Sequence, residues 1–398
     1  MPEPILTLSP EAGPEQLGPP TPDWGDLALV LTGGGARAAY QVGVLSYIAE
    51  RFPELRIPIL VGISAGAVNT AYLAAHPGTL ARAVEELWNL WLGLLPERVF
   101  RVDASSLARK VVRSGAQLVS GGVRGAPRVQ GMVDTAPLRA FLERALAPTD
   151  GELAGIQENL RRGTLRAAAV VTTSYTTGQT VVFVQGRGIE TWERPLRRSV
   201  QARLGVEHVM ASTALPFFFP AVQVGDGWYG DGGIRLTAPL SPALHLGAHK
   251  ILAISTHYLR SRSEADRPAV VGYPPPAQVL GVLYNAIFLD LIDQDVLRMQ
   301  RVNRLLERVP VEERQGMRIV DLLALRPSRD LGALAGDYEP RLPRAFRFLA
   351  RGLGTRETAA PDLLSTVMFQ PDYLRRLLEL GQADARASEA EIAEFLAR

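Results

Sequence analysis

One serine stands in a pattern that is typical of catalytic nucleophiles. The segment GISAG, residues 62–66, places Ser64 between a short apolar run and a segment with helical periodicity. In such a strand-to-helix turn, small neighbours permit a strained backbone that exposes the serine hydroxyl. The N-terminus of the following helix favours negative charge nearby. Glycine and serine are common, so the plain alternative is a tight turn with an incidental serine. The context favours Ser64 as a nucleophile for acyl transfer.

Three consecutive glycines, Gly33, Gly34 and Gly35, end the apolar run LALVL just before a helical pattern. Such a run costs backbone entropy, whereas free backbone N–H groups at the N-terminus of a helix attract negative charge. Acyl transfer creates this charge on a tetrahedral oxyanion, so we expect an oxyanion hole here. The competing interpretation is a nucleotide phosphate loop. Against it, the segment lacks both the G-x-x-x-x-G-K-[ST] pattern and the G-x-G-x-x-G spacing.

Two side chains are candidates for the base that a serine nucleophile needs. His257 follows the apolar run ILAIST and could lie at the carboxyl end of a strand, which would put Ser64, Asp231 and His257 in one known triad order. Asp231 lies in the segment YGDGG, whose backbone can approach the serine closely, and could itself be the base. It could also be a turn carboxylate that hydrogen-bonds its own backbone. The residues alone leave these interpretations open.

Strands and helices alternate through the first part of the chain. Buried strands are expected at residues 27–31 and 57–62, followed by helices at 37–52 and 65–76. This alternation predicts parallel pairing with right-handed crossovers, hence an α/β sheet covered on both faces. The later patterns predict helices at 79–95, 105–119 and 135–146, a hairpin at 165–186, a helix ended by Pro216, and a buried strand at 249–256.

The composition excludes several classes of protein. The chain has 398 residues, of which 47% are hydrophobic and 21% charged, as in soluble globular proteins. Its net charge of +2 is too small to indicate nucleic-acid binding. The absence of cysteine rules out disulfides, thiolate metal ligands and cysteine nucleophiles. No apolar run reaches the ~18 residues expected of a membrane-spanning helix. Residues 1–26 are proline-rich without a basic start, so we expect a poorly ordered lead-in and a cytoplasmic protein.

Four segments, in matching order, resemble the patatin-like phospholipase family: GGGARAAYQVGVL, GISAGAVN, ASTALPFFFPAV and GDGWYGDGGIRLTAPLSPALHLGAHKILAIS. The resemblance extends over about residues 27–257. It implies a three-layer α/β/α fold with a mainly parallel central sheet. It further implies a dyad of Ser64 and Asp231 without histidine, and Gly33, Gly34 and Gly35 as the oxyanion hole. Arg37 would support the hole or meet a substrate phosphate, and no metal or other cofactor would be needed.

The resemblance implies a serine lipid acyl hydrolase, acting as a phospholipase A, lysophospholipase or esterase. Ala38 stands where the family usually has glycine, and Thr237 where it often has asparagine, so substrate specificity stays open. A transacylase, in which a second alcohol replaces water, is an alternative. A non-catalytic lipid-binding module is another, although such a module would not need the serine, the aspartate and the glycines together.

The proline-rich segment GYPPPAQ suggests a boundary between a catalytic domain at 27–272 and a mainly helical region at 273–398. Helical patterns cover 278–309, 343–353 and 371–397. In the second of these, Arg344, Arg347 and Arg351 share one face beside apolar residues, which suits peripheral membrane contact. Residues 217–219, all phenylalanine, would line an acyl pocket or help in docking. Arginines on a helix are more often a solvated face, and a phenylalanine run is more often core. The sequence indicates no oligomeric state.

Overall fold

The structure is a computed structural model. It describes residues 26–101, 131–266, 272–274, 276–288, 291–342 and 362–398. The helices expected at 105–119 and 343–353 lie outside these ranges, as does nearly all of the expected N-terminal lead-in.

The described strands form one ten-stranded sheet, ordered β10-β9-β1-β2-β3-β4-β6-β5, with β8 pairing with β3 and β7 with β8. The run from β10 to β3 is parallel throughout. Beyond it, β4 and β8 are antiparallel to β3. The strands are β1 (Leu27–Leu31), β2 (Ile59–Ile63), β3 (Ala167–Ser174), β4 (Thr180–Gly186), β5 (Glu193–Arg194), β6 (Arg197–Gln201), β7 (Val222–Val224), β8 (Gly227–Asp231), β9 (Lys250–Ile254) and β10 (Asp321–Leu325).

The helices follow the predicted alternation with the strands in the first part of the chain. The longer helices are α1 (Ala39–Arg51), α2 (Ala65–Ala75), α3 (Leu80–Leu92), α6 (Ala136–Leu146), α7 (Ala154–Arg162), α8 (Val206–Ser212), α11 (Pro276–Phe288), α12 (Leu291–Leu306), α16 (Pro371–Ala387) and α17 (Glu389–Ala397). The shorter ones are η1 (Gly35–Ala38), α4 (Pro96–Val99), η2 (Gly232–Arg235), α9 (Ser241–His245), α10 (Arg262–Ala265), η3 (Val311–Glu313), α13 (Leu331–Gly336), η4 (Glu339–Arg341) and α15 (Asp362–Val367).

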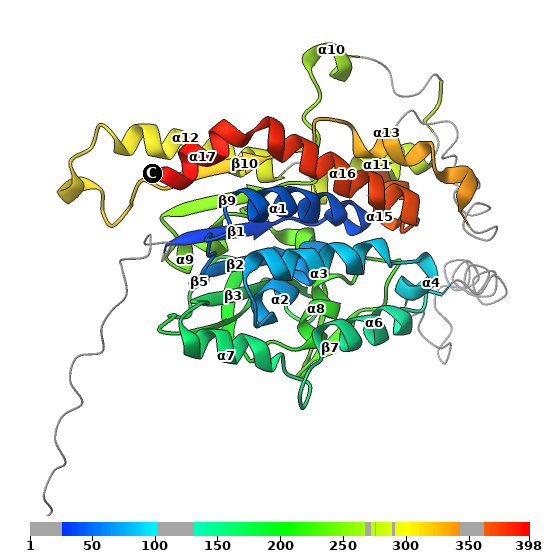
Figure 1. The fold of residues 1–398 in the computed structure, drawn as a ribbon, viewed down its shortest axis with the longest axis horizontal. Coiled ribbons are helices and arrows are strands. Elements are labelled where there is room, and N and C mark those ends of the chain that lie inside the picture. The colour runs from blue at the N-terminus through cyan, green and yellow to red at the C-terminus, as the bar shows by residue number, and fades with distance from the viewer. Residues whose placement is uncertain (1–25, 102–130, 267–271, 275, 289–290, 343–361) are drawn as a thin grey trace, which may run out of the picture.

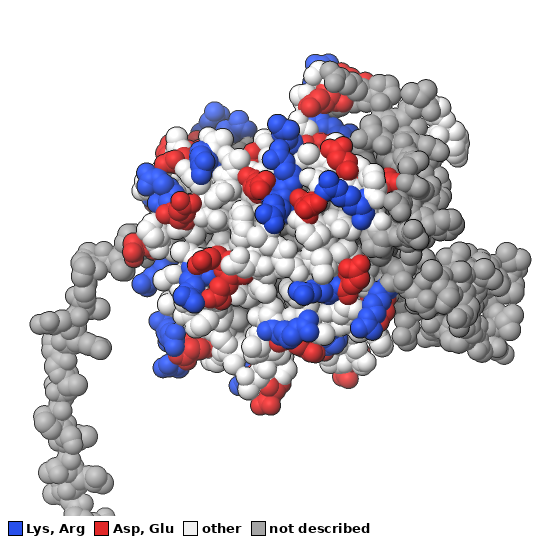
Figure 2. Space-filling view, turned by 45° about the vertical axis from the view of Figure 1, so that its right-hand side comes forward, with Lys and Arg blue, Asp and Glu red and all other residues white. Residues whose placement is uncertain are grey.

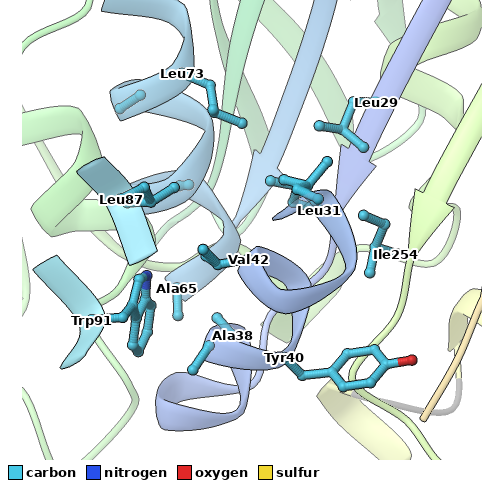
Figure 3. Close-up of a cluster of buried hydrophobic side chains, with 14 of the residues drawn as sticks. Leu29, Leu31, Ala38, Tyr40, Val42, Ala65, Leu73, Leu87, Trp91 and Ile254 are labelled. Carbon is cyan, nitrogen blue, oxygen red and sulfur yellow. The ribbon is translucent and has the colours of Figure 1, made fainter. Parts of the chain in front are cut away.

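Helices cover both faces of the sheet, which gives the expected three layers (Figure 1). Successive side chains of a strand point to opposite faces, and β1 shows the consequence. Leu29 and Leu31 belong to the core under α1, α2, α3 and α16, whereas Ala28 and Val30 belong to the core under α9 and α12. A strand buried on both faces is apolar along its whole length, as LALVL is. Figure 3 shows the first core, with side chains from α1, α2 and α3 gathered beside β1.

In the described residues, the C-terminal region contains helices over two of the predicted patterns, 278–309 and 371–397, and also a strand that the sequence pattern does not predict. In β10, Asp321 to Leu325 pair in parallel with Lys250 to Ile254 of β9. A five-residue run of mostly leucine and alanine favours helix by propensity, and only the unpaired edge of β9 makes it a strand. The mainly helical region expected at 273–398 thus also contains one strand, β10.

Helix α16 packs directly on α1 through two glycines. A Cβ atom at Gly43 of α1 would lie 2.0 Å from the carbonyl oxygen of Leu378, and one at Gly381 would lie 2.2 Å from that of Tyr40. The two backbones touch because neither glycine carries a side chain. The division expected at residue 272 therefore does not separate two hydrophobic cores, since α16 shares the core of α1.

Charged side chains of both signs are interspersed over the face that Figure 2 shows, and no broad area of that face carries one sign. None of the helices in the described ranges combines the length and the apolar character needed to cross a bilayer.

Candidate active site

Ser64 lies in a sharp turn between β2, which ends at Ile63, and α2, which begins at Ala65. Its backbone has φ 54° and ψ −130°, a conformation that residues other than glycine rarely adopt. Such strain persists only where the surroundings hold it. Here the Ser64 N–H donates to Ser212 Oγ at 2.9 Å, and Ser212 Oγ donates to the Val171 carbonyl at 2.6 Å. The turn expected from GISAG is thus present.

The two glycines that flank Ser64 are required by close packing. A Cβ atom at Gly62 would lie 2.5 Å from Ala67 Cα, in the first turn of α2. A Cβ atom at Gly66 would lie 2.3 Å from the carbonyl oxygen of Leu31, at the end of β1. These distances are far shorter than van der Waals contact, so the helix can start this close to the sheet only with glycine at both positions.

Strand pairing brings Asp231 to the serine. Ile63 at the end of β2 pairs with Val171 of β3, so Ser64 stands level with Thr172. Thr172 also pairs with Asp231 at the end of β8. Because β4 occupies the other edge of β3 at this level, β8 pairs with β3 on the same edge as β2, directly beyond the end of β2. The ends of β2 and β8 therefore meet, one carrying the hydroxyl and the other the carboxylate.

Ser64 Oγ donates a hydrogen bond to Asp231 Oδ2 at 2.6 Å. The other carboxylate oxygen, Oδ1, accepts the N–H of Gly233 at 2.8 Å, while the backbone is held by Ala214 and Thr173. Asp231 is only 1% exposed. Burial raises its pKa from 3.8 to about 7, although the bonds from Ser64 and Gly233 lower it. A carboxylate in this state can accept a proton near neutral pH.

The glycine loop lies against the nucleophile. A Cβ atom at Gly33 would lie 3.0 Å from Ser64 Cβ. Gly34 has φ 145° and Gly35 φ 57°, which favours glycine at both positions. Within the described part of the chain, their N–H groups donate to no other protein group. The loop is anchored by Thr256 Oγ1, which donates to the Gly33 carbonyl at 2.6 Å. Two N–H groups are thus left for a ligand or a reacting atom.

Arg37 is buried, with 2% exposure. Its Nη2 donates to Asp362 Oδ1 at 2.7 Å, and its Nε donates to Ser365 Oγ at 2.6 Å. It does not line the cavity that contains Ser64. Of the two roles expected for Arg37, support of the glycine loop fits this burial better than contact with a substrate phosphate.

His257 lies in a different environment from Ser64. Its Nδ1 is 2.7 Å from Asp293 Oδ2, and the same carboxylate accepts from Arg326 at 2.8 Å. His257 lines a second cavity, beside Tyr258 and Arg260, and not the one that contains Ser64. The structure therefore brings Asp231, and not His257, to the serine hydroxyl.

An apolar cavity extends from Ser64 into the core. No charged side chain lines it within the described residues. Its walls come from α2, α3, α4, α6 and α11 and from the segments around α8 and α15; they include Val68, Leu87, Trp91, Val99, Leu138, Leu142, Leu215, Phe219, Tyr284, Val367 and Phe369. Of the expected phenylalanine run, Phe219 lines this cavity, whereas Phe217 is 87% exposed. The cavity has the character of an acyl-chain site.

Several residues of the site carry no signal that the sequence analysis could use. Ser212, which holds the N–H of Ser64, lies in ASTALPFFFPAV, so the family resemblance pointed to its segment but not to its role. Asp362 and Ser365 stand more than 300 positions from Arg37, in no motif. In the described ranges, no group of three or more His, Asp or Glu side chains could hold a metal ion.

A sequence model of the patatin-like phospholipase family matches residues 29–244, and a comparison with curated proteins gives no match. Similar solved structures include human GIVD cytosolic phospholipase A2 in complex with methyl gamma-linolenyl fluorophosphonate, at 16% identity and TM-score 0.42. VipD from Legionella pneumophila is similar at 14% identity and TM-score 0.34. The alignments cover 96% and 89% of this chain. They cover 60% and 67% of those chains, so this chain spans about three fifths of the human protein. Since the family model matches more than half of the chain, the chain belongs to the patatin-like phospholipase family.

Proposed function

We propose that the protein hydrolyses fatty acyl esters of lipids through Ser64 as nucleophile and Asp231 as general base. The observation that carries this proposal is the 2.6 Å hydrogen bond between Ser64 Oγ and Asp231 Oδ2 at the end of an apolar cavity. Membership in the patatin-like phospholipase family supports a lipid acyl hydrolase. The headgroup, acyl length and ester position are not part of the proposal.

In the first half-reaction, Ser64 Oγ attacks the ester carbonyl carbon while its proton passes to Asp231 Oδ2. The carbonyl π electrons move to oxygen and form the tetrahedral oxyanion. When the intermediate collapses, the ester C–O bond breaks, and the leaving alkoxide takes the proton from Asp231. The product alcohol departs and the acyl group stays on Ser64 as an ester.

In the second half-reaction, water takes the place of the alcohol. Asp231 accepts a proton from the water molecule as the water oxygen attacks the carbonyl carbon of the acyl-enzyme. Collapse of the second tetrahedral intermediate breaks the bond to Ser64 Oγ, which recovers its proton from Asp231. A transacylase would differ only in using a second alcohol here, so the two reactions are separated by the product formed when an acceptor alcohol is added.

We assign the oxyanion hole to the loop of Gly33, Gly34 and Gly35. Two facts support the assignment: the loop lies against Ser64, and the N–H groups of Gly34 and Gly35 have no protein acceptor in the described residues. Backbone donors already aimed at a developing charge stabilise the transition state without having to reorganise.

Substitution of Gly33 tests the loop with little disturbance to the fold. In Gly33→Ala the new methyl group would lie 3.0 Å from Ser64 Cβ, so either the serine or the loop must shift by a few tenths of an ångström. Because catalysis depends on such alignment, we expect kcat to fall by about tenfold or more, with an almost unchanged melting temperature. Steady-state kinetics on a short acyl ester measure the effect. A normal kcat with a raised KM would mean that the loop binds ground-state substrate instead.

Gly35 would be a poor choice for the same test. A Cβ atom there would lie 2.1 Å from the Thr366 carbonyl oxygen, at φ 57°. A valine at this position would therefore disturb packing, and a loss of activity would not distinguish an oxyanion donor from a folding defect.

The pKa of Asp231 predicts how activity depends on pH. The base must be ionised to take the serine proton, and its pKa is raised by burial to about 7. We therefore expect kcat/KM to fall as pH decreases through about 7, since kcat/KM reports groups of the free enzyme. A neutral ester substrate ensures that only the enzyme titrates. A profile that stays flat well below pH 7 would contradict Asp231 as the base.

Peripheral contact with a membrane is part of the proposal, because lipid substrates reside in aggregates. Phe217, which is exposed, stands two positions from Phe219 in the cavity wall, so the exposed apolar group is near the cavity along the chain. The arginines at 344, 347 and 351, expected to contribute, lie outside the described residues. A cytoplasmic location stays a prediction.

One experiment tests the function and the membrane contact together. The full chain is incubated with a fluorophosphonate probe, and then with a panel of monoacyl and diacyl lipids in neutral and anionic vesicles. Labelling of Ser64 and release of fatty acid support the hydrolase. Absence of both, in folded protein, would favour the non-catalytic lipid-binding module. Co-sedimentation in the same samples measures membrane contact, and equal negligible binding to both vesicles would remove that part of the proposal.

A further inference from the structure

The ion pair between Arg37 and Asp362 joins two parts of the chain that are far apart in sequence. Arg37 belongs to η1, directly after the glycine loop, and Asp362 begins α15. Besides the bond to Oδ1, Arg37 Nη2 donates to the Asp362 carbonyl at 3.2 Å, and Nε donates to Ser365 Oγ. Side-chain exposure is 3% for Arg37 and 12% for Asp362. Within the described residues, α15 therefore supplies all the hydrogen-bond acceptors of this guanidinium.

Asp362 is itself held by a second helix. Its other oxygen, Oδ2, accepts Asn285 Nδ2 of α11 at 2.7 Å. The residue before Asn285, Tyr284, lines the cavity that contains Ser64. Both carboxylate oxygens are thus engaged, and the direction of the Arg37 side chain is set from outside the motif that contains it.

The same pair reaches the glycine loop through short connections. The Arg37 N–H donates to the Gly34 carbonyl at 3.1 Å. Gly35 faces the Thr366 carbonyl so closely that no Cβ would fit between them. A shift of Arg37 or of α15 would therefore move the peptide groups on both sides of Gly34. These two peptide groups carry the N–H groups of Gly34 and Gly35, which are assigned to the oxyanion hole.

An arginine buried without a partner is strongly disfavoured. If Asp362 lost its charge, Arg37 would be driven to find another acceptor or water, and its backbone would be free to follow. Thr256, which bonds the Gly33 carbonyl, anchors only the far end of the loop. The pair therefore restrains the near end.

We propose that Asp362 is a positioning residue for the oxyanion hole, acting through Arg37, and that α15 thereby forms part of the catalytic apparatus. This inference rests on the proposed function. Asp362 and Ser365 do not line the acyl cavity, so they should not affect how the acyl chain binds. Substitution of these residues should weaken stabilisation of the transition state, because the oxyanion is absent from the bound substrate. We therefore expect kcat to fall while KM stays unchanged.

Five variants test the proposal in the full chain: Asp362→Asn, Ser365→Ala, Arg37→Gln, the double variant Arg37→Gln/Asp362→Asn and, as a matched control, Asp293→Asn. Asp293 is also a partly buried aspartate bonded to an arginine, Arg326, but it does not contact the glycine loop. The assay is hydrolysis of p-nitrophenyl butyrate, with rates divided by the concentration of sites that the fluorophosphonate finally labels. Melting temperatures are measured beside it.

For Asp362→Asn we expect kcat per labelled site to fall by about tenfold to a hundredfold, the scale of a misaligned catalytic group. KM and the pH at half-maximal kcat/KM should stay unchanged. Ser365→Ala should show a smaller loss of kcat, and Asp293→Asn none. The double variant Arg37→Gln/Asp362→Asn should be no slower than Arg37→Gln alone, because the two residues act as one unit.

If Asp362→Asn and Ser365→Ala only lower the melting temperature and keep wild-type kcat per labelled site, the pair is structural and the proposal is overturned. A multiplicative loss in the double variant would also overturn it. If Asp362→Asn does not fold, Ser365→Ala and the double variant, which removes both charges, decide the question. If the wild-type protein neither reacts with the fluorophosphonate nor hydrolyses any ester, the proposed function is rejected. This outcome differs from the failure of the Asp362 proposal, in which the wild-type protein is active.

Discussion

Replacing Ser64 with alanine is expected to abolish ester hydrolysis, with kcat falling at least about a thousandfold. The alanine removes the only hydroxyl that is hydrogen-bonded to Asp231 Oδ2 among the described residues. Without it no acyl-enzyme can form, and what activity remains can come only from water bound beside the glycine loop. The fold should persist, because alanine needs no new space and the Ser64 N–H keeps its bond to Ser212.

Ser241→Ala is a suitable control for this variant. Ser241 is the first residue of α9, whereas Ser64 directly precedes α2, and Ser241 does not line the cavity that contains Ser64. Its replacement should leave both hydrolysis and fluorophosphonate labelling at the wild-type level. If Ser64→Ala retained substantial activity, or still reacted with the probe, another residue would be the nucleophile and the turn at Ser64 would have only a structural role.

The second large effect is expected at Asp231. An amide cannot accept the serine proton, so Asp231→Asn should lower kcat/KM by about a hundredfold to ten-thousandfold, the usual contribution of a general base. His257→Ala should stay close to wild type, because His257 pairs with Asp293 and lines another cavity. Parallel kinetics of the two variants on one ester separate a dyad from a triad. Collapse of the histidine variant, in folded protein, would make His257 the base and Asp231 its orienting partner.

Thermal stability gives an independent control on Asp231→Asn. The folded chain holds the Asp231 proton up to about pH 7, whereas the unfolded chain releases it near 3.8. The carboxyl group therefore lowers the free energy of unfolding as pH rises between these values, and the penalty persists above them. The asparagine variant lacks this penalty. At pH 8 it should melt at a higher temperature than wild type, and a lower one would indicate that the amide disrupts the turn.

Local sequence determined the parts of the site that depend on neighbouring residues. The turn at Ser64 follows from the two glycines that flank it, because only they allow α2 to start against β1. The strand β1 and the helix α1 follow from a continuous apolar run and a helical repeat. The backbone of the glycine loop likewise depends on the positive φ angles of Gly34 and Gly35. These are steric and periodic properties that a few consecutive residues express by themselves.

Tertiary structure decided which distant residues meet. The sequence left Asp231 and His257 both open as the base. Pairing of β8 with β3 placed the aspartate at the serine, while Asp293 of α12 pairs with His257 elsewhere. The same holds for Arg37, whose acceptors on α15 belong to no motif. A short leucine-rich run became β10 only because β9 offered a free edge. Such choices depend on packing between segments that are tens to hundreds of residues apart, which no local pattern contains.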